Sequence, residues 1–271
     1  MEDIILEGKQ IVKNFALKKE VFWEKQKILQ AVGGINIQLR RGQTIGIVGE
    51  SGSGKSTLGE ILGGLQRPTS GRVLYRGKDL AQMNREERRQ YRRNIQFIFQ
   101  NPKESMNPYF TIEKILTEPM KLLDENYTPD YARQKIAEIL PQVGMEPDCI
   151  RKYPSELSGG QCQRIAIARA LLLNPEIIVC DECVSALDVS VQAQILNLLK
   201  SLQRRYGTSY LFISHDMGVI HYMSDYVLVM VGGKIIEQGE GAAVMSHPAQ
   251  AYTAQLINSS LFREDSICAA L

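Results

Sequence analysis

Several features are scarce in this chain of 271 residues, and each scarcity excludes a class of protein. Its longest apolar runs, at residues 177–180 and 226–231, are strand-sized and fall far short of the roughly 18 residues that span a bilayer. The N-terminus carries acid at Glu2 and Asp3, where a secretion signal would carry positive charge. We therefore expect a cytosolic protein without a transmembrane helix.

An excess of charge of one sign is also lacking. Lys and Arg total 32, Asp and Glu total 30, and the net charge is +2. This balance gives no electrostatic basis for nucleic acid or an anionic membrane as the main partner. The hydrophobic share of 44% and the charged share of 23% are ordinary globular values, which exclude long disorder and collagen-like repeats.

Cysteines are few and odd in number. The chain has 5, without the paired spacing of a zinc ribbon, so we expect reduced thiols. Cys180 and Cys183 form a C-x-x-C pattern, which is a weak indication of a redox or metal site. We favour a structural role for the pair, because Cys180 ends a strand that reads as buried and no second pair exists.

Strands and helices alternate along most of the chain. Residues 35–39 alternate apolar and polar side chains, which predicts a half-buried strand, whereas the continuous apolar run at 177–180 predicts a strand covered on both faces. The order predicts a largely parallel α/β sheet with an antiparallel β patch at the N-terminus. Further strands are predicted at 4–8, 11–15, 44–48, 71–75, 95–100, 209–213, 226–231 and 234–238, and helices at 56–65, 158–173, 189–205 and 217–222.

A helical subdomain is predicted between two of these strands. The subdomain spans residues 101–157: a loop at 101–110 precedes helical spacing from residue 112 to residue 143, with interruptions expected at Pro119 and Pro129. Just before it, residues 84–93 are dense in Arg and Glu. We interpret that segment as a solvated helix face of alternating charge rather than a binding patch.

A glycine-rich loop follows the strand at 44–48 and opens a helix. It matches the G-x-x-x-x-G-K-[ST] pattern, in which backbone N–H groups and the positive end of the helix dipole surround phosphate. Lys55 would reach the β- and γ-phosphates, and the Ser56 hydroxyl would ligate Mg²⁺. The predicted nucleotide-binding residues here are Gly49, Glu50, Ser51, Gly52, Ser53, Gly54, Lys55, Ser56 and Thr57.

Two acids end the apolar run at 177–180. Asp181 is the expected carboxylate on the Mg²⁺ side, acting through water because Mg²⁺ keeps several waters. Glu182 could polarise the attacking water as a general base. Two adjacent acids are a weak signal alone and become a strong one downstream of a phosphate loop.

The segment Leu157-Ser158-Gly159-Gly160-Gln161 matches the signature sequence of a known protein family. A Ser-Gly-Gly turn at a helix start is a second anion-binding device. With it, the chain resembles the ATP-binding subunits of ABC transporters over almost its whole length. The resemblance implies the P-loop ATPase fold of that family: a RecA-like, mostly parallel core, an N-terminal antiparallel β subdomain and an inserted α-helical subdomain. It places one nucleotide-binding domain at 1–257, followed by a short tail at 258–271.

The resemblance also implies roles for single residues. Ser158, Gly159, Gly160 and Gln161 would complete the ATP site of a partner subunit, as would Asp188 of the Ser-Ala-Leu-Asp segment. Gln100 is similar to the glutamine that contacts Mg²⁺ and the attacking water and links the site to membrane subunits. His215 is similar to the histidine that contacts the γ-phosphate. Because every hydrolytic motif is present, the site should be competent for turnover.

An aromatic ring that stacks on adenine is expected near the N-terminus. Phe15 stands at the family's position, and a π-face is all that stacking requires. Phe22 and Trp23 are rival candidates in a longer loop. Cys183 departs from the family's sequence pattern, since many relatives have Pro or Ala at this position.

Three segments resemble one group of transporters, the importers of oligopeptides, dipeptides and nickel. These are residues 99–108, residues 184–190, and His247-Pro248 with Tyr252-Thr253. The chain is similar to the second ATPase of such systems, the one lacking a cysteine cluster near its end, and Cys268 alone cannot form one. The implied partners are a second, different ATPase subunit, two transmembrane permease subunits and an extracytoplasmic binding protein, with no nucleic acid. The implied place is the cytoplasmic face of the membrane.

The transported molecule is not encoded in these motifs. Peptide is the first choice, nickel or a metal chelate the second, and glutathione-like compounds the third; ATP and Mg²⁺ are the implied cofactors. A soluble ABC-type ATPase acting on nucleic acid or ribosomes is the alternative function. It is less favoured because the chain has no coiled-coil, zinc or tandem-domain insertion. A plain P-loop kinase is disfavoured by residues 157–161 and 185–188.

Overall fold

The computed structural model describes the backbone of residues 3–16 and 28–267, with side chains up to residue 260. The chain divides into two compact units, and each is described by itself. Unit 1 comprises Met1–Asn84 and Leu211–Phe262, and unit 2 comprises Arg85–Tyr210 and Arg263–Leu271.

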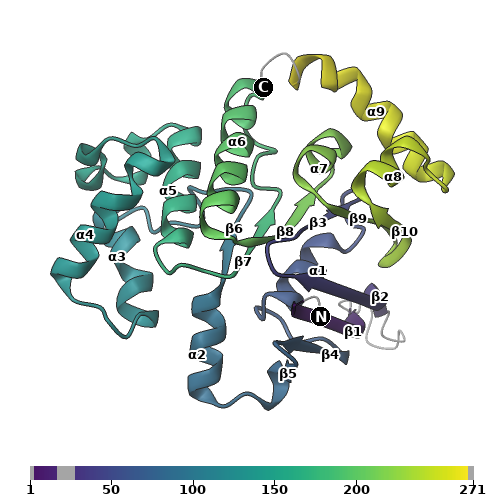
Figure 1. The fold of residues 1–271 in the computed structure, drawn as a ribbon, viewed down its shortest axis with the longest axis horizontal. Coiled ribbons are helices and arrows are strands. Elements are labelled where there is room, and N and C mark those ends of the chain that lie inside the picture. The colour runs from purple at the N-terminus through teal and green to yellow at the C-terminus, as the bar shows by residue number, and fades with distance from the viewer. Residues whose placement is uncertain (1–2, 17–27, 268–271) are drawn as a thin grey trace, which may run out of the picture. The chain divides into compact units, whose positions relative to one another are not determined.

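Unit 1 contains a four-stranded antiparallel sheet near the N-terminus (Figure 1). Its order is β2-β1-β4-β5, with β1 (Ile4–Ala16), β2 (Ile28–Arg40), β4 (Ser70–Tyr75) and β5 (Lys78–Asp79). The two short strands predicted at 4–8 and 11–15 are one strand, β1. Its pairing with β2 is irregular between Gly8 and Ile11, where Gln10 has φ 49° and its N–H donates to Asn36 Oδ1 at 2.9 Å. This irregularity gives a single strand the sequence appearance of two.

The second sheet of unit 1 is mixed, with parallel and antiparallel pairs. Its strands lie in the order β10-β9-β3-β8, where the end of β8 (Ser209–Ser214) belongs to this unit. β3 (Thr44–Val48) pairs in parallel with β9 (Tyr226–Val231), and β10 (Lys234–Glu240) pairs antiparallel to β9. All five residues of β3 are buried, as expected for a strand covered on both faces.

Four helices of the described residues lie wholly or mostly in unit 1. α1 (Lys55–Leu62) packs against β1 and β2, and α7 (Met217–Met223) packs against β3. α8 (Gly241–Ser246) packs against β10, and α9 (Ala251–Ile267) follows it. The sequence analysis predicted no helix beyond residue 222, so α8 and α9 are additions. α9 runs across residue 258, where the sequence analysis placed the start of a short tail.

Unit 2 combines two parallel strands with helices. β6 (Ile95–Ile98) pairs with β7 (Ile177–Asp181), and the segment between them contains α3 (Ile112–Leu123), α4 (Pro129–Ile139), short 3₁₀ turns and α5 (Gly159–Leu171). α3 packs against α4 and α5 (Figure 1). α6 (Val189–Tyr206) follows β7. The Arg/Glu-rich segment forms α2 (Arg85–Asn94), in which only Tyr91 is buried.

The predicted interruption at Pro119 is wrong. Pro119 lies inside α3, which continues to Leu123. A proline removes one helical hydrogen bond, but burial of Ile112, Ile115, Leu116 and Met120 keeps this helix intact. α3 ends at Leu123 with Asp124 as its C-cap, and Pro129 opens α4 at the first turn, where its missing N–H costs nothing.

Among the residues that the structure describes, none of the helices combines the length and the apolar character of a bilayer-spanning segment.

Candidate nucleotide site

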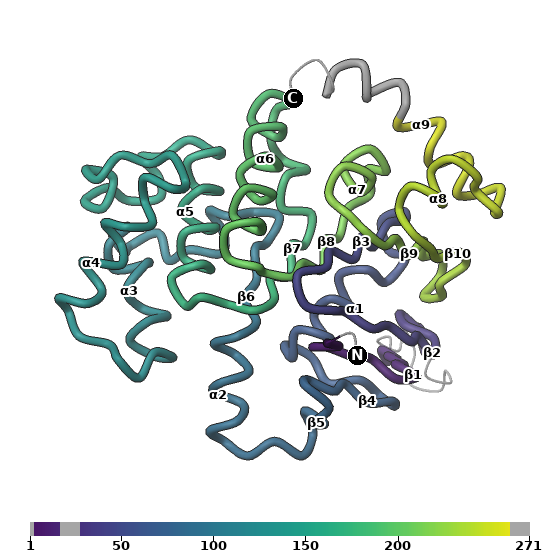
Figure 2. The backbone as a smooth tube through the Cα atoms, in the orientation of Figure 1, coloured from purple at the N-terminus to yellow at the C-terminus, as the bar shows by residue number. Residues whose placement is uncertain are grey.

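The glycine-rich loop lies between β3 and α1, where Figure 2 follows the backbone around it. Two of its glycines have no room for a side chain. A Cβ on Gly49 would lie 2.2 Å from the Met230 carbonyl oxygen, and one on Gly54 would lie 2.1 Å from that of Ala31. Gly54 also has φ 98°, which L side chains rarely adopt. The loop therefore requires glycine at both positions.

The inside of the loop carries a buried ammonium. Lys55 Nζ donates to the carbonyl oxygens of Gly49 at 2.7 Å and Glu50 at 2.8 Å. Ser53 Oγ is also buried and has no hydrogen-bond partner within the described part of the chain. A buried hydroxyl without a partner is costly. An oxygen-rich ligand such as a phosphate would satisfy it, so the loop fits the group that its sequence predicts.

The outside of the loop is held by other parts of unit 1. The N–H of Gly233 donates to the Ser53 carbonyl at 3.0 Å, and the N–H of Gly33 donates to the Gly233 carbonyl at 2.8 Å. The N–H of Glu50 donates to Tyr252 Oη at 3.0 Å. Sequence reasoning did not place Tyr252 at the loop, although it singled out the segment that contains it.

His215 is exposed and directly follows β8 in unit 1. Its backbone is fixed on both sides, because the N–H of Asp216 donates to Ser214 Oγ at 3.0 Å and the Asp216 carboxylate caps α7. The imidazole is thus presented from a rigid turn.

Phe15 lies near the end of β1 and is half-buried, with Lys13 Nζ 5.1 Å from its ring centroid. Its rivals Phe22 and Trp23 lie outside the described residues.

The acidic residues that the sequence predicts for the site lie in unit 2. β7 ends at Asp181, and Glu182 follows with φ 47°. Gln100 Nε2 donates to Glu182 Oε2 at 3.2 Å and to Ser185 Oγ at 3.1 Å. Ser185 Oγ donates back to the Glu182 carbonyl at 2.9 Å.

A left-handed backbone is unusual for glutamate and costs about 1–2 kcal/mol. Such outliers concentrate at functional sites where the surroundings hold them. Here the amide of Gln100 and the hydroxyl and N–H of Ser185 provide that hold. Ser185 is the second residue that sequence reasoning missed at the site, because it was assigned only to a loop between subunits.

The Ser-Gly-Gly-Gln turn begins α5 with a reciprocal cap. Ser158 Oγ accepts the Gln161 N–H at 3.3 Å, and Gln161 Oε1 accepts the Ser158 N–H at 2.9 Å. Gly159 is exposed, and a Cβ on Gly160 would lie 2.7 Å from Val191 of α6. Asp188 Oδ1 accepts the Val191 N–H at 2.9 Å and so caps α6. The turn presents exposed backbone donors on a rigid helix start.

Cys180 and Cys183 are buried and hydrogen-bonded to each other. Burial first, and then the neighbouring Cys183, raises the pKa of Cys180 well above its usual value. A protonated, buried thiol is inert.

The described residues contain no group of three or more His, Cys, Asp or Glu side chains that could hold a metal ion.

Residues 32–185 match the family described as ABC transporter. The chain belongs to this family. It is 45% identical to "Oligopeptide transport ATP-binding protein OppF" of Salmonella typhimurium, over 94% of this chain and 77% of the relative. It is 39% identical to "Dipeptide transport ATP-binding protein DppF" of Escherichia coli, over 96% of this chain and 77% of the relative.

Solved structures are similar as well. The dimeric ATP-binding cassette MJ0796 bound to ADP and Pi has a TM-score of 0.77 and 28% identity, covering 87% of this chain and 98% of that one. The structure of cbiO1 from Clostridium perfringens has a TM-score of 0.75 and 26% identity, covering 99% of this chain and 100% of that one. The expected family, the ABC ATPase fold and the expected ATPase activity are thereby confirmed.

Proposed function

We propose that this chain is the ATP-hydrolysing subunit of an ABC importer that takes up oligopeptides or dipeptides, with nickel or a metal chelate ranking behind. The observation that carries the proposal is a phosphate loop with a buried, unpartnered Ser53 hydroxyl. It lies in a chain 45% identical, over 94% of its length, to an oligopeptide transport ATP-binding protein.

The loop binds the triphosphate through its own backbone and two side chains. The first N–H groups of α1 point along the helix dipole toward the anion, with Ser56 and Thr57 in the first turn. Lys55 turns from the carbonyls of Gly49 and Glu50 toward the β- and γ-phosphates. Ser53 Oγ gains a partner. On the base side, Phe15 stacks on adenine.

Mg²⁺ would be held by the Ser56 hydroxyl, the Gln100 side-chain oxygen and the Asp181 carboxylate. All three are hard oxygen donors, which is the chemistry that Mg²⁺ prefers. Gln100 uses its Nε2 to contact Glu182 and Ser185, so its oxygen is the atom for the metal. The ion would neutralise charge on the phosphates.

Hydrolysis uses a base that is already oriented. Glu182 accepts the proton of the attacking water while Gln100 holds its carboxylate, and His215 contacts the γ-phosphate. The structure supports this assignment by the strained backbone of Glu182 and by the three hydrogen bonds that hold it.

The exposed turn at Ser158–Gln161, together with Asp188, completes the site of a second, different ATPase subunit. ATP then favours a closed dimer, and hydrolysis removes that preference. A nearly complete shift needs about 5.5 kcal/mol. A few charge-assisted hydrogen bonds at about 1.5–3 kcal/mol each supply it. The dimer sits on the cytoplasmic face of the membrane, beneath two permease subunits that receive substrate from an extracytoplasmic binding protein.

The test is reconstitution of the chain with its neighbouring permease, ATPase and binding-protein subunits in vesicles. We expect ATP-driven accumulation of labelled peptide, stimulated by peptide-loaded binding protein and absent from a Lys55→Ala complex. Accumulation of nickel but not peptide would identify nickel or a metal chelate as the transported substrate. Co-purification with RNA or DNA and no permease would establish the soluble ATPase instead.

A further inference from the structure

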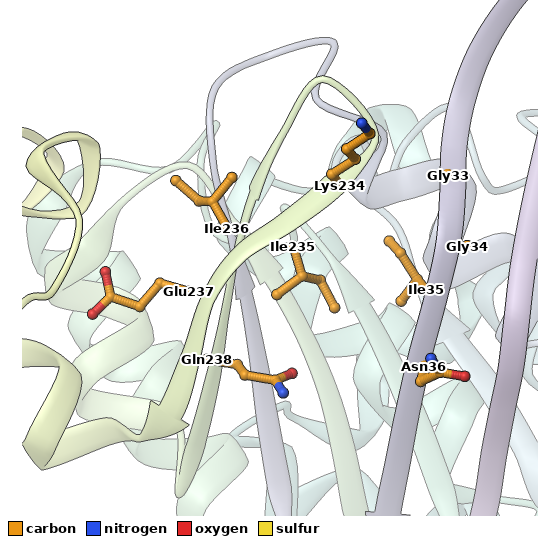
Figure 3. Close-up of a pocket in the computed structure, with 9 residues that line it drawn as sticks. All are labelled: Gly33, Gly34, Ile35, Asn36, Lys234, Ile235, Ile236, Glu237 and Gln238. Carbon is orange, nitrogen blue, oxygen red and sulfur yellow. The ribbon is translucent and has the colours of Figure 1, made fainter.

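A bulge in β10 helps to position the C-terminal helix of unit 1 next to the phosphate loop. The pairing of β10 with β9 is irregular between Ile235 and Glu237. Figure 3 shows the result: Ile236 and Glu237 project to the same side of β10, whereas Ile235 projects toward the slot beside β2. This slot is the pocket between residues 33–36 of β2 and residues 234–238 of β10, with a volume of about 470 Å³, and the Glu237 carboxylate lies on the side of β10 opposite Ile235. A bulge re-aims a side chain in this way.

The re-aimed carboxylate fixes the start of α9. Glu237 accepts the N–H of Ala249 at 2.7 Å and the N–H of Gln250 at 3.0 Å, just before α9 begins at Ala251. A carboxylate at a helix N-terminus also interacts favourably with the helix dipole. Burial of Glu237 acts to raise its pKa, but the hydrogen bonds outweigh burial and lower it. The charged carboxylate is therefore the form that the fold stabilises.

Tyr252 is the second residue of the helix fixed in this way. Its side chain is half-buried, and its hydroxyl oxygen accepts the N–H of Glu50 at 3.0 Å. Glu50 is the first residue of the loop after Gly49, and its carbonyl accepts Lys55 Nζ at 2.8 Å. One loop residue is thus held at its N–H by the C-terminal helix and at its carbonyl by the loop lysine.

We propose that Tyr252 is a positioning residue of the nucleotide site, set in place by Glu237 and acting on the loop through the Glu50 N–H. The inference rests on the proposed binding of ATP by residues 49–56. When Lys55 turns to the phosphates, it releases the Glu50 carbonyl, and the Tyr252 hydroxyl remains as the hold on the other side of that residue. Its contribution therefore grows in the nucleotide-bound loop.

The test is Tyr252→Phe in the full chain, which removes one oxygen and keeps the ring. We expect the Kd for ATP and, in the assembled complex, the KM for ATP to rise about 3- to 10-fold, as for one lost hydrogen bond, with a much smaller change in kcat. Tyr206→Phe is the matched control. It also removes a tyrosine hydroxyl that is hydrogen-bonded, to Gln142 of unit 2, and its Kd should stay at the wild-type value.

A double variant separates positioning from general stability. Glu237→Gln should weaken ATP binding in the same direction. Glu237→Gln combined with Tyr252→Phe should bind no more weakly than the worse single variant, because both act through one contact. Fully additive losses, or a Tyr252→Phe variant that loses thermal stability but keeps wild-type Kd and KM, would overturn the inference. Wild-type chain that binds no ATP would instead overturn the proposed function.

Discussion

Gly54→Ala is the substitution whose effect the structure defines most sharply. The added Cβ would lie 2.1 Å from the carbonyl oxygen of Ala31 and 3.2 Å from its carbon. Both partner atoms are backbone, so no flexible side chain can move aside. The φ of 98° is also unfavourable for alanine. The loop must leave its present conformation to accept the methyl group.

Two contributions add to the effect. The left-handed backbone costs about 1–2 kcal/mol, and forcing a methyl group into filled space costs about 1–3 kcal/mol. Together they destabilise the loop conformation that binds nucleotide by about 2–5 kcal/mol. Because the apparent affinity falls with the population of the competent state, the Kd for ATP should rise at least about 30-fold.

Gly42→Ala is the matched control. Gly42 has φ 72°, and a Cβ there would meet nothing within 4 Å, so this variant has the backbone strain without the overlap. Calorimetric titration of the full chain with ATP should give a wild-type Kd for Gly42→Ala and greatly weakened binding for Gly54→Ala. A cooperative thermal unfolding transition for each variant would establish that both remain folded. Equal Kd values for the two variants would refute the reasoning.

Three further predictions concern the acidic half of the site and the C-terminal helix. Glu182→Gln should lower kcat of the assembled complex by about 10²- to 10⁴-fold while ATP binding is retained; normal turnover would remove Glu182 as the base. Ser185→Ala should lower kcat about 3- to 10-fold with little change in the KM for ATP, because Gln100 and Glu182 lose a shared partner; unchanged kcat would contradict this. Glu237 has a lowered pKa, so its stabilising cap is complete above the usual carboxyl pKa of about 4.3 and is lost as the pH falls through its lower folded value. The difference in thermal stability between wild type and Glu237→Gln should therefore shrink as the pH falls below the usual carboxyl pKa of about 4.3, and a difference that stays constant on acidification would argue against the cap.

Local patterns were enough to locate the two turns that are predicted to bind phosphate. The strand at 44–48 has the predicted bounds, and both Ser158 and the glycine loop stand at helix starts as predicted. These features depend on neighbours within a few residues, which a sequence displays directly. Pro119 shows the limit of such rules, because buried side chains elsewhere on α3 outweigh the lost hydrogen bond.

Contacts between distant segments could not be predicted in this way. Glu50 and Tyr252 are 202 positions apart, and Gln100 and Ser185 are 85 apart. Neither pair has a periodic pattern that connects its members.

α9 was missed for a different reason. Among its described side chains, up to residue 260, the buried ones are Thr253, Ile257 and Ser260, which have helical spacing but include two hydroxyl side chains. A search for apolar residues at helical spacing does not detect such a stripe.

The central claim is that ATP is shared between this chain and a companion subunit. The most direct measurement is a structure of the assembled transporter carrying Glu182→Gln with ATP and Mg²⁺ bound. The account predicts that the γ-phosphate held by the companion's phosphate loop lies within hydrogen-bonding distance, about 3 Å, of Ser158 or the N–H groups at the start of α5. A fully loaded complex in which this helix start lies beyond hydrogen-bonding reach of every triphosphate would contradict it.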